Sequence, residues 1–326
     1  MSSLLELDDL HVWFDLGDGR ELYAVQGVSL SLDAGQRLGL VGESGCGKTT
    51  TVLGLLGLLP PSASVSGRVV FNGKDILAGG EDSIRPHRWT DLAIVFQGAM
   101  NALNPVQTVS AQIVEALELH GSASGRAARA RVGELLEAVG IPRDRGNRYP
   151  HEFSGGMRQR AAIAMALACN PSVLVADEPT TALDVMVQAQ ILELLVSLAS
   201  DFNLALILVT HDLPVVAQVC DRAAVMYAGE VAESASIDAL FHTPKHPYTR
   251  LLFAATPDLR AGGDRVASIP GAPPRLDKPI VGCPFQPRCD SAFAPCATET
   301  PLLKNVSERH VAACHLNDHV REPATA

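Results

Sequence analysis

A glycine-rich stretch at 42–49, Gly-Glu-Ser-Gly-Cys-Gly-Lys-Thr, constrains the fold more than any other part of the sequence. It fits the pattern G-x-x-x-x-G-K-[ST]. It follows a short apolar run at 37–41 and precedes a segment at 50–59 that we expect to be helical, ending at Pro60. Glycines allow the backbone to fold so tightly that successive N–H groups face phosphate oxygens, and the helix that follows adds the positive end of its dipole. The stretch therefore predicts a phosphate-binding loop between a strand and a helix.

The residues of this loop are candidates for contacts with a nucleoside triphosphate and its magnesium ion. Lys48 would place a positive charge on the β and γ phosphates, and Thr49 would offer its hydroxyl to Mg²⁺. We expect Cys46 to contribute its backbone N–H rather than its thiol. The other candidates for nucleotide contact are Gly42, Glu43, Ser44, Gly45, Gly47 and Thr50. A chance Gly-rich turn is the alternative interpretation, and the flanking strand and helix disfavour it.

Short apolar segments separated by helical patterns predict the class of the fold. Apolar runs of strand length lie at 92–96, 172–176 and 204–209, and segments between residues 4 and 32 also alternate like strands. Strands that are buried on both faces read as continuous apolar runs, and helices usually connect them when they are parallel. The sequence therefore predicts an α/β fold with a largely parallel, buried sheet.

Changes in the pattern along the chain indicate how it is organised. Residues from about 105 to 170 are expected to be helical throughout, with 3.6-residue apolar spacing at 109–120 and 127–139. This pattern predicts a helical insertion between two core strands. Because the pattern changes again after the next strands, we expect a nucleotide-binding domain at 1–240 and a C-terminal extension at 241–326.

Length, charge and hydropathy exclude several classes of protein. The chain has 326 residues, a net charge of −10 and 5% aromatic residues. A general binder of nucleic acid or of anionic membranes should be basic, so both classes are excluded as global properties. No run reaches the ~18 apolar residues that a spanning helix needs, and the N-terminus lacks the basic and apolar regions of a signal peptide. We expect a cytoplasmic protein that a partner would have to hold at a membrane.

Two acidic residues end the apolar segment at 173–176. Carboxylates at the C-terminal end of a buried strand face the ligand crevice of an open α/β sheet. Asp177 would hold Mg²⁺ through water, and Glu178 would orient or deprotonate an attacking water. The alternative is a strand that exits into solvent and happens to end in acids, and the phosphate loop makes that alternative weaker.

A second candidate phosphate site lies at 153–160, Phe-Ser-Gly-Gly-Met-Arg-Gln-Arg, before an Ala-rich segment. Ser154, Gly155 and Gly156 at a helix N-terminus would form an anion site without a lysine. Two separate phosphate sites suggest ATP held between two subunits. These motifs resemble those of the ABC-transporter ATPase family, whose signature is usually Leu-Ser-Gly-Gly-Gln. The chain departs from it with Phe at the first position and Met at the last, a version that resembles the one in peptide and nickel importers.

The resemblance covers roughly residues 4–250, with every motif of the family in order. It implies a P-loop ABC-type ATPase core with an antiparallel β subdomain and a helical subdomain. It also implies that Gln97 lies in the Q-loop, that the D-loop at 181–184 crosses the dimer interface, and that His211 contacts the γ-phosphate. The catalytic candidates are then Glu178, His211 and Gln97, and the magnesium ligands are Thr49, Gln97 and Asp177. Phe14 sits where the family's adenine-stacking ring usually lies, with Trp13 and Tyr23 as alternatives because strand alternation decides which ring faces the nucleotide.

The C-terminal extension carries two features that narrow the resemblance. The stretch at 246–249, His-Pro-Tyr-Thr, resembles one in dipeptide and oligopeptide importer ATPases. Four cysteines resemble the tail of the same subfamily: Cys283, Cys289, Cys296 and Cys314. In a reducing cytosol, clustered thiols suggest a soft metal site more than disulfides. The chain lacks the paired C-x2-C knuckles of the usual zinc ribbon, so we expect a [4Fe–4S] cluster rather than Zn²⁺. Four unligated thiols are the third interpretation.

The resemblance implies the ATP-binding and ATP-hydrolysing subunit of a membrane importer of dipeptides or oligopeptides. Its implied partners are a second ATPase subunit in a heterodimer or homodimer, two integral-membrane permease subunits and an extracytoplasmic substrate-binding protein, but no nucleic acid. The chain would lie peripherally on the cytoplasmic face of the cell membrane. An importer of nickel or another solute is the alternative within the class.

A soluble ABC ATPase of translation or DNA repair is the alternative from another class. Such proteins typically carry two cassettes or a long coiled-coil insertion, and this sequence has neither. A non-hydrolytic regulatory subunit is a third possibility, and the presence of Glu178 and His211 argues against it.

Overall fold

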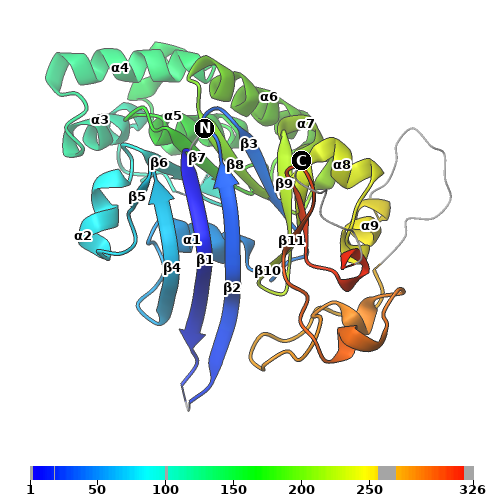
Figure 1. Cartoon of the computed structure of the whole chain (residues 1–326). Coiled ribbons are helices and arrows are strands. Elements are labelled where there is room, and N and C mark those ends of the chain that lie inside the picture. The colour runs from blue at the N-terminus through cyan, green and yellow to red at the C-terminus, as the bar shows by residue number, and fades with distance from the viewer. Residues whose placement is uncertain (1–2, 18, 100–101, 256–268, 319–326) are drawn as a thin grey trace, which may run out of the picture. The chain divides into compact units, whose positions relative to one another are not determined.

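The structure is a computed structural model that describes residues 3–17, 19–99, 102–255 and 269–318 (Figure 1). The chain forms two compact units. The first unit comprises Met1–Ser31, Leu38–Ala78 and Thr210–Ala326, and the second comprises Leu32–Arg37 and Gly79–Val209.

An antiparallel sheet in the first unit has the strand order β2-β1-β4-β5, and β4, β1 and β2 are seen side by side in Figure 1. The strands are β1 (Leu5–Asp15), β2 (Glu21–Leu32), β4 (Ala63–Phe71) and β5 (Lys74–Asp75). Leu5 and Leu7 are buried, and so are Leu10 and Val12 after a register shift between Asp8 and His11. An extra residue at such a bulge keeps the apolar side chains on one face although their spacing changes. This sheet confirms the expected antiparallel strands near the N-terminus.

A second group of strands in the first unit has the order β11-β12-β10-β9-β3. These strands are β3 (Arg37–Val41), β9 (Arg222–Tyr227), β10 (Glu230–Ser236), β11 (Lys304–Ser307) and β12 (His310–Ala312). β3 is parallel to β9, and the other pairs are antiparallel. The C-terminal hairpin of β11 and β12 therefore extends the sheet that begins behind the phosphate loop, and the structure does not show it as a separate cysteine-rich module.

The helices of the first unit flank these strands. They are α1 (Lys48–Leu55), α7 (Leu213–Val219), α8 (Ile237–His242) and α9 (Pro247–Ala254), with short 3-10 turns at Gln286–Arg288, Ala294–Ala297 and His315–Asn317. The helix predicted at 50–59 is α1, which begins two residues earlier, directly after Gly47. Its C-cap is Leu56, and Gly57 follows with a φ of 61°. The left-handed conformation of Gly57 ends the helix before Pro60, where the sequence predicted the end.

Glu233 in β10 ties three parts of the first unit together. Its side chain is fully buried, and its carboxylate accepts hydrogen bonds from the backbone N–H of Lys245 at 2.7 Å and of His246 at 2.9 Å. Oε1 also lies 2.7 Å from Nε2 of His310 in β12. A buried carboxylate is stable only when partners satisfy its oxygens. Glu233 therefore connects β10, the start of α9 and the C-terminal hairpin.

The second unit contains a parallel group of strands in the order β8-β7-β6, formed by β6 (Leu92–Val95), β7 (Val173–Asp177) and β8 (Ala205–Thr210). All residues of β7 and β8 are buried. The three apolar runs that predicted a buried parallel sheet are thus confirmed as strands within one or two residues.

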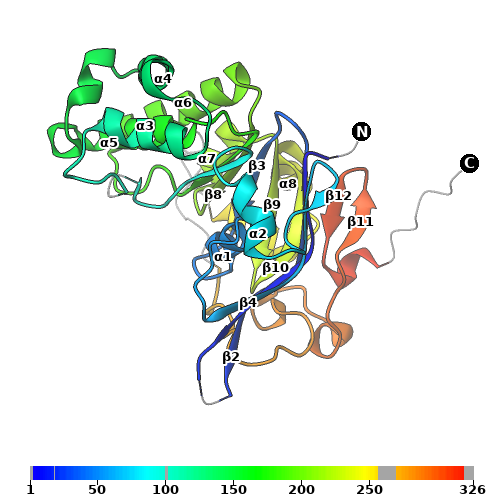
Figure 2. The same cartoon turned by 90° about the vertical axis from the view of Figure 1, so that its left-hand side faces the viewer.

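The second unit contains helices before, within and after the helical insertion that was expected at about 105–170. They are α2 (Glu81–Ile84), α3 (Val109–Leu119), α4 (Gly125–Ala138), α5 (Gly155–Ala166) and α6 (Val185–Asp201), with short 3-10 turns at Arg85–His87, Arg143–Asn147 and Pro150–Glu152. Helices α3, α4 and α5 pack against one another (Figure 2). Over the parts of the chain that the structure describes, no helix is long and apolar enough to cross a bilayer.

Candidate functional site

The phosphate loop connects β3 to α1 in the first unit, and its glycines are required by the backbone around them. Gly42 and Gly47 have φ angles of 151° and 104°. A Cβ atom would lie 2.2 Å from the carbonyl oxygen of Met226 at Gly42, and 2.4 Å from that of Ala24 at Gly47. At Gly45 a Cβ atom would meet nothing within 4 Å. The loop is therefore packed against β2 and β9 on one side and open at Gly45.

Lys48 is folded back onto the loop that contains it. Its Nζ donates hydrogen bonds to the carbonyl oxygens of Gly42 at 2.8 Å and Glu43 at 3.0 Å, and the residue is only 6% exposed. Its Nζ also lies 3.7 Å from Sγ of Cys46, and burial raises the pKa of this thiol. The N–H of Cys46 donates to the carbonyl oxygen of Glu43 at 3.3 Å. A bound phosphate would have to draw Lys48 away from these carbonyl groups.

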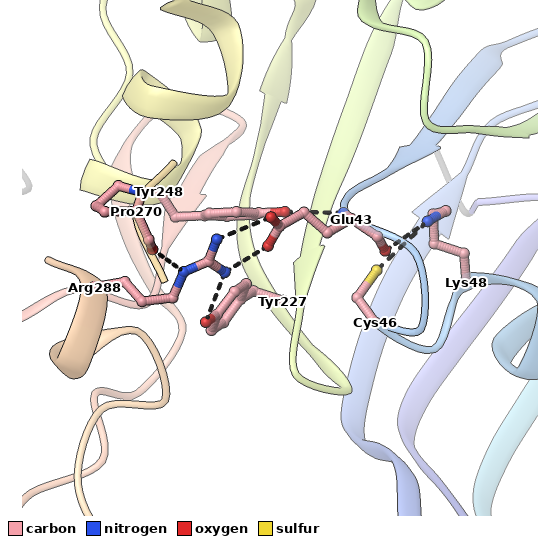
Figure 3. Close-up of polar contacts among 7 residues, drawn as sticks. All are labelled: Glu43, Cys46, Lys48, Tyr227, Tyr248, Pro270 and Arg288. Atoms are coloured by element: carbon pink, nitrogen blue, oxygen red, sulfur yellow. Dashed lines mark hydrogen bonds and ion pairs between the residues drawn. The ribbon is translucent and has the colours of Figure 1, made fainter. Parts of the chain in front are cut away.

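A cluster of side chains from β9, α9 and the C-terminal segment surrounds Glu43 (Figure 3). Arg288 donates to the carboxylate of Glu43 from Nη1 at 2.6 Å and from Nη2 at 3.0 Å. The backbone N–H of Glu43 donates to the hydroxyl of Tyr248 at 3.0 Å, and Arg288 also donates to the hydroxyl of Tyr227 at 3.2 Å. Burial raises the pKa of both tyrosines, so their hydroxyls remain protonated at neutral pH.

Sequence reasoning included Glu43 as a loop residue but missed Arg288, Tyr227 and Tyr248 as its partners. The only available signals were the position of Arg288 directly before Cys289 and the place of Tyr248 in the stretch at 246–249.

Glu178 follows β7 in the second unit, and one residue from each of two predicted motifs, the Q-loop and the D-loop, lies at its carboxylate. Oε2 accepts hydrogen bonds from Nε2 of Gln97 at 2.8 Å and from the hydroxyl of Thr181 at 3.0 Å. The φ of Glu178 is 44°, which is uncommon for a residue with a side chain. Such backbone strain often occurs at functional sites. The preceding Asp177 is 2% exposed at the end of the strand. The structure thus brings Gln97, Glu178 and the start of the D-loop together.

Ser154 and the two glycines that follow it start α5 in the second unit. The hydroxyl of Ser154 accepts a hydrogen bond from the N–H of Met157 at 3.3 Å, and it therefore caps the helix. At Gly156, a Cβ atom would lie only 2.7 Å from Cγ1 of Val187 in α6. In the same way, Asp184 caps α6 by accepting from the N–H of Val187 at 3.0 Å. The signature and the D-loop therefore begin two helices that contact each other.

The remaining predicted residues lie on strands or directly after them. His211 is exposed and follows β8, and Asp212 caps α7 by accepting from the N–H of Val215 at 3.4 Å. Phe14 and Trp13 are half-buried near the end of β1. Tyr23 in β2 is 39% exposed and donates to the carboxylate of Glu21. The choice of the adenine-stacking ring stays a prediction.

The four C-terminal cysteines influence one another, but they do not form a recognisable metal site. Burial, together with smaller contributions from the neighbouring Cys296 and Cys314, raises the pKa of Cys283 to about 11. The N–H of Cys283 donates to the carbonyl oxygen of Cys296 at 2.8 Å. Within the described ranges, however, no group of three or more His, Cys, Asp or Glu side chains is arranged to hold a metal ion. The [4Fe–4S] cluster expected at Cys283, Cys289, Cys296 and Cys314, and its zinc alternative, therefore gain no support from the structure.

Two family models match the chain. Residues 25–181 match the model described as "ABC transporter", and residues 232–296 match "Oligopeptide/dipeptide transporter, C-terminal region". The chain belongs to the ABC transporter family, and it is an ATP-binding ATPase of that family. Within the family it is similar over nearly its whole length to proteins named for peptide transport.

Two relatives illustrate this similarity. The dipeptide transport ATP-binding protein DppD of Bacillus subtilis is 47% identical over 99% of this chain and 98% of its own length. The oligopeptide transport ATP-binding protein OppD of Escherichia coli is 47% identical over 92% of this chain and 89% of its own length.

Solved structures of ATP-binding cassettes share the fold. The cassette MJ0796, determined as a dimer in a post-hydrolysis state with ADP and Pi, aligns with a TM-score of 0.63 and 29% identity over 72% of this chain and 98% of its own. The cbiO1 protein of Clostridium perfringens, part of a transporter complex, aligns with a TM-score of 0.62 and 29% identity over 74% of this chain and 92% of its own.

Proposed function

We propose that the chain powers the import of dipeptides or oligopeptides through a membrane ABC transporter. The observation that carries this proposal is the match of residues 232–296 to the C-terminal region of oligopeptide and dipeptide transporters. In this chain β10, the start of α9 and β12, which lies just beyond that region, all connect at Glu233. The region is therefore an integral part of the unit that contains the phosphate loop.

We propose that the phosphate loop binds the triphosphate of ATP. Lys48 would exchange its two carbonyl partners for phosphate oxygens, and the loop amides near the open position at Gly45 would donate to the same groups. The hydroxyl of Thr49, the amide of Gln97 and the carboxylate of Asp177 are hard oxygen donors, which is the donor type that Mg²⁺ prefers. Mg²⁺ held by these residues would neutralise charge on the phosphates.

Glu178 is the proposed general base. Its carboxylate would accept a proton from the attacking water, and the hydrogen bonds from Gln97 and Thr181 would keep it oriented. His211 would contact the γ-phosphate and hold the same water. These roles extend the family resemblance, and the hydrogen bond between Gln97 and Glu178 supports the role of Glu178.

We propose that ATP is clamped between two ATPase subunits, with Ser154, Gly155 and Gly156 of one subunit facing the nucleotide of the other. The D-loop supports a subunit contact, because Val185 and Met186 directly after it are 78% and 72% exposed. Adjacent apolar side chains of this exposure suit burial against a partner. The assembly would further contain two permease subunits and a substrate-binding protein, and the chain would sit peripherally at the cytoplasmic face of the membrane. A heterodimer of two different ATPases is preferred to a homodimer.

The cysteines belong to a separate proposal, in which Cys283, Cys289, Cys296 and Cys314 bind a [4Fe–4S] cluster or Zn²⁺ with a structural role. This proposal rests on the soft-metal chemistry of four clustered thiols and on the resemblance of the cysteine spacing to the tail of the peptide-importer subfamily. Iron, sulfide and zinc analysis after anaerobic purification tests it. Absence of all three elements would leave the cysteines as unligated thiols.

A transport assay tests the main proposal. Membrane vesicles that contain the chain and its co-purified permeases should accumulate a labelled dipeptide when ATP is supplied, and they should not accumulate labelled nickel. The same vesicles with Lys48→Ala should accumulate neither. ATP-driven nickel uptake without peptide uptake would contradict the proposal, and so would purification of the chain without hydrophobic subunits.

A further inference from the structure

Arg288 connects the cysteine segment, defined as residues 283–296, to the phosphate loop of the same unit (Figure 3). Its two terminal nitrogens donate to the two carboxylate oxygens of Glu43, at 2.6 and 3.0 Å. The side chain of Arg288 is 4% exposed and that of Glu43 is 26% exposed. Bidentate pairing adds a fixed direction to the strength of a charge-assisted hydrogen bond. The contact therefore fixes both the position and the charge of Glu43.

The guanidinium group of Arg288 is itself held in place. Nε donates to the carbonyl oxygen of Pro270 at 2.7 Å, and Nη1 donates to the hydroxyl of Tyr227 at 3.2 Å. Cζ also lies 5.7 Å from the centre of the Tyr227 ring. A lysine ammonium cannot reproduce this set of planar contacts. These contacts hold the guanidinium group of Arg288 in one position, so a movement of the loop would break its hydrogen bonds to Glu43.

Glu43 is fixed at three of its polar groups. Arg288 binds the carboxylate, Tyr248 accepts from the N–H at 3.0 Å, and Lys48 donates to the carbonyl oxygen at 3.0 Å. Arg288 and Lys48 lie on opposite sides of Glu43 in Figure 3. A bound phosphate must draw Lys48 away from the carbonyl oxygen of Glu43. The hydrogen bonds from Arg288 to the carboxylate of Glu43 can persist when phosphate binds. Glu43 is also the acidic side chain of a loop that takes up anions, and an unpaired carboxylate there would repel phosphate.

The docking of the C-terminal segment does not depend on Arg288 alone. β12 pairs with β10, and His310 contacts Glu233 at 2.7 Å. Arg250 of α9 pairs with Asp290, directly after Cys289, at 2.7 Å. A buried ion pair adds little net stability because both charges lose their hydration. The contact between Arg288 and Glu43 is therefore better explained by what it does to the loop.

We propose that Arg288 is a positioning residue for the phosphate loop, which acts through Glu43 to hold the loop in the shape that takes up ATP and to neutralise its carboxylate. The inference goes beyond the proposed function, and it rests on the proposed role of the loop in binding ATP.

ATP titrated into the full chain tests the proposal, with Glu178→Gln present in every variant so that ATP is not consumed. We expect Arg288→Met to weaken ATP binding about tenfold, and Arg288→Lys to weaken it by a smaller factor. In a Glu43→Gln background, Arg288→Met should cause no further loss, because the carboxylate it acts through is gone. Without Glu178→Gln, Arg288→Met should raise KM for ATP and leave kcat nearly unchanged.

Two controls separate the possible failures. Arg250→Met removes another ion pair of the same segment and should bind ATP like the parent, and Lys48→Ala should abolish binding. If Lys48→Ala still binds ATP, the proposed role of the loop fails. If Lys48→Ala abolishes binding while Arg288→Met stays within about twofold of the parent, only the inference on Arg288 is overturned.

Two other results would also overturn the inference on Arg288. One is a loss of ATP affinity in Arg250→Met as large as in Arg288→Met, and the other is an undiminished effect of Arg288→Met in the Glu43→Gln background. Either result would mean that Arg288→Met acts by loosening the packing of the cysteine segment and not through Glu43. Thermal melts accompany each titration. If Arg288→Met does not fold, Arg288→Lys with and without Glu43→Gln carries the same comparison.

Discussion

Glu178 combines three properties at a single residue: a left-handed backbone conformation, a carboxylate bonded to Gln97 and Thr181, and a place directly after a buried strand. The backbone N–H of Glu178 donates to the carbonyl oxygen of Val209 at 2.9 Å, which anchors the turn to β8. Both the backbone and the carboxylate of Glu178 are thereby held in place. This arrangement suits a group that must meet water and a phosphate at a defined position.

Glu178→Gln should retain ATP binding and lower the hydrolysis rate by about 10²–10⁴-fold, because the amide keeps the shape but cannot accept a proton. Phosphate release at saturating ATP, compared with a direct measurement of ATP affinity, checks both parts. Glu193→Gln, on the exposed side of α6, is the matched control and should hydrolyse ATP at the parent rate. Normal turnover in Glu178→Gln would remove this residue from the mechanism.

At the scale of elements, the contact between α5 and α6 depends on a missing side chain. A Cβ atom at Gly156 would lie 2.7 Å from Cγ1 of Val187, closer than carbon atoms can pack. Gly156→Ala should therefore lower the free energy of unfolding by about 1–3 kcal/mol, as overpacking does elsewhere. Val187→Ala in the same chain should restore much of this loss by making room. Urea unfolding of the single and double variants measures these changes in the free energy of unfolding. Equal stability of Gly156→Ala and the parent would contradict the predicted clash.

A second prediction concerns the junction of β10 and α9, where His246 caps the helix through Nδ1, which accepts from the N–H of Tyr248 at 3.0 Å. Burial lowers the pKa of His246 from 6.5 to about 4. The unfolded chain therefore takes up a proton first as the pH falls from 6.5 toward 4, and this histidine makes folding less favourable over that range.

His246→Asn keeps an acceptor at the helix cap and removes the titration. The stability of the parent relative to this variant should fall by about 1–3 kcal/mol between pH 7.5 and pH 4.5, measured by urea unfolding. Burial raises the pKa of Glu230 to about 7, so this residue makes folding more favourable as the pH falls. Glu230 is present in both proteins, and its effect therefore cancels in the comparison. A pH-independent difference between the two proteins would show that His246 does not titrate in this way.

The elements also show what the sequence could and could not predict. The strands around the phosphate loop and the helices of the insertion were predictable because apolar periodicity and the loop pattern are local in sequence. The hairpin of β11 and β12 was not, because its short, polar strands have no such periodicity and pair through the backbone. The pair of Glu43 and Arg288 joins positions 245 residues apart, so no local pattern encodes it. Gln97 was assigned to the catalytic site only through the family resemblance, and its hydrogen bond to Glu178 was not predicted.

At the scale of the whole molecule, two exposed apolar side chains at the start of α6 bear on how one ATPase chain associates with another. Val185 and Met186 leave an apolar surface at the start of α6 directly after Asp184, and the capping hydrogen bond from the N–H of Val187 to the carboxylate of Asp184 fixes its position. If this surface is buried in the ATP-bound assembly, a charge there must be desolvated on association, which is costly without a partner charge. Met186→Asp should therefore weaken association and leave folding unchanged.

Sedimentation of the Glu178→Gln chain, alone and with the second ATPase of the proposed heterodimer, should show an ATP-dependent dimer that Met186→Asp weakens at least about tenfold. Leu119→Asp is the matched control, since Leu119 is 77% exposed at the end of α3 and lies outside the D-loop. ATP affinity of the isolated chain should be the same in both variants, because neither residue belongs to the phosphate loop. An ATP-dependent dimer that forms equally well with Met186→Asp would place the subunit contact elsewhere, and the proposed clamp at Ser154 and its glycines would lose the support that the D-loop gives it.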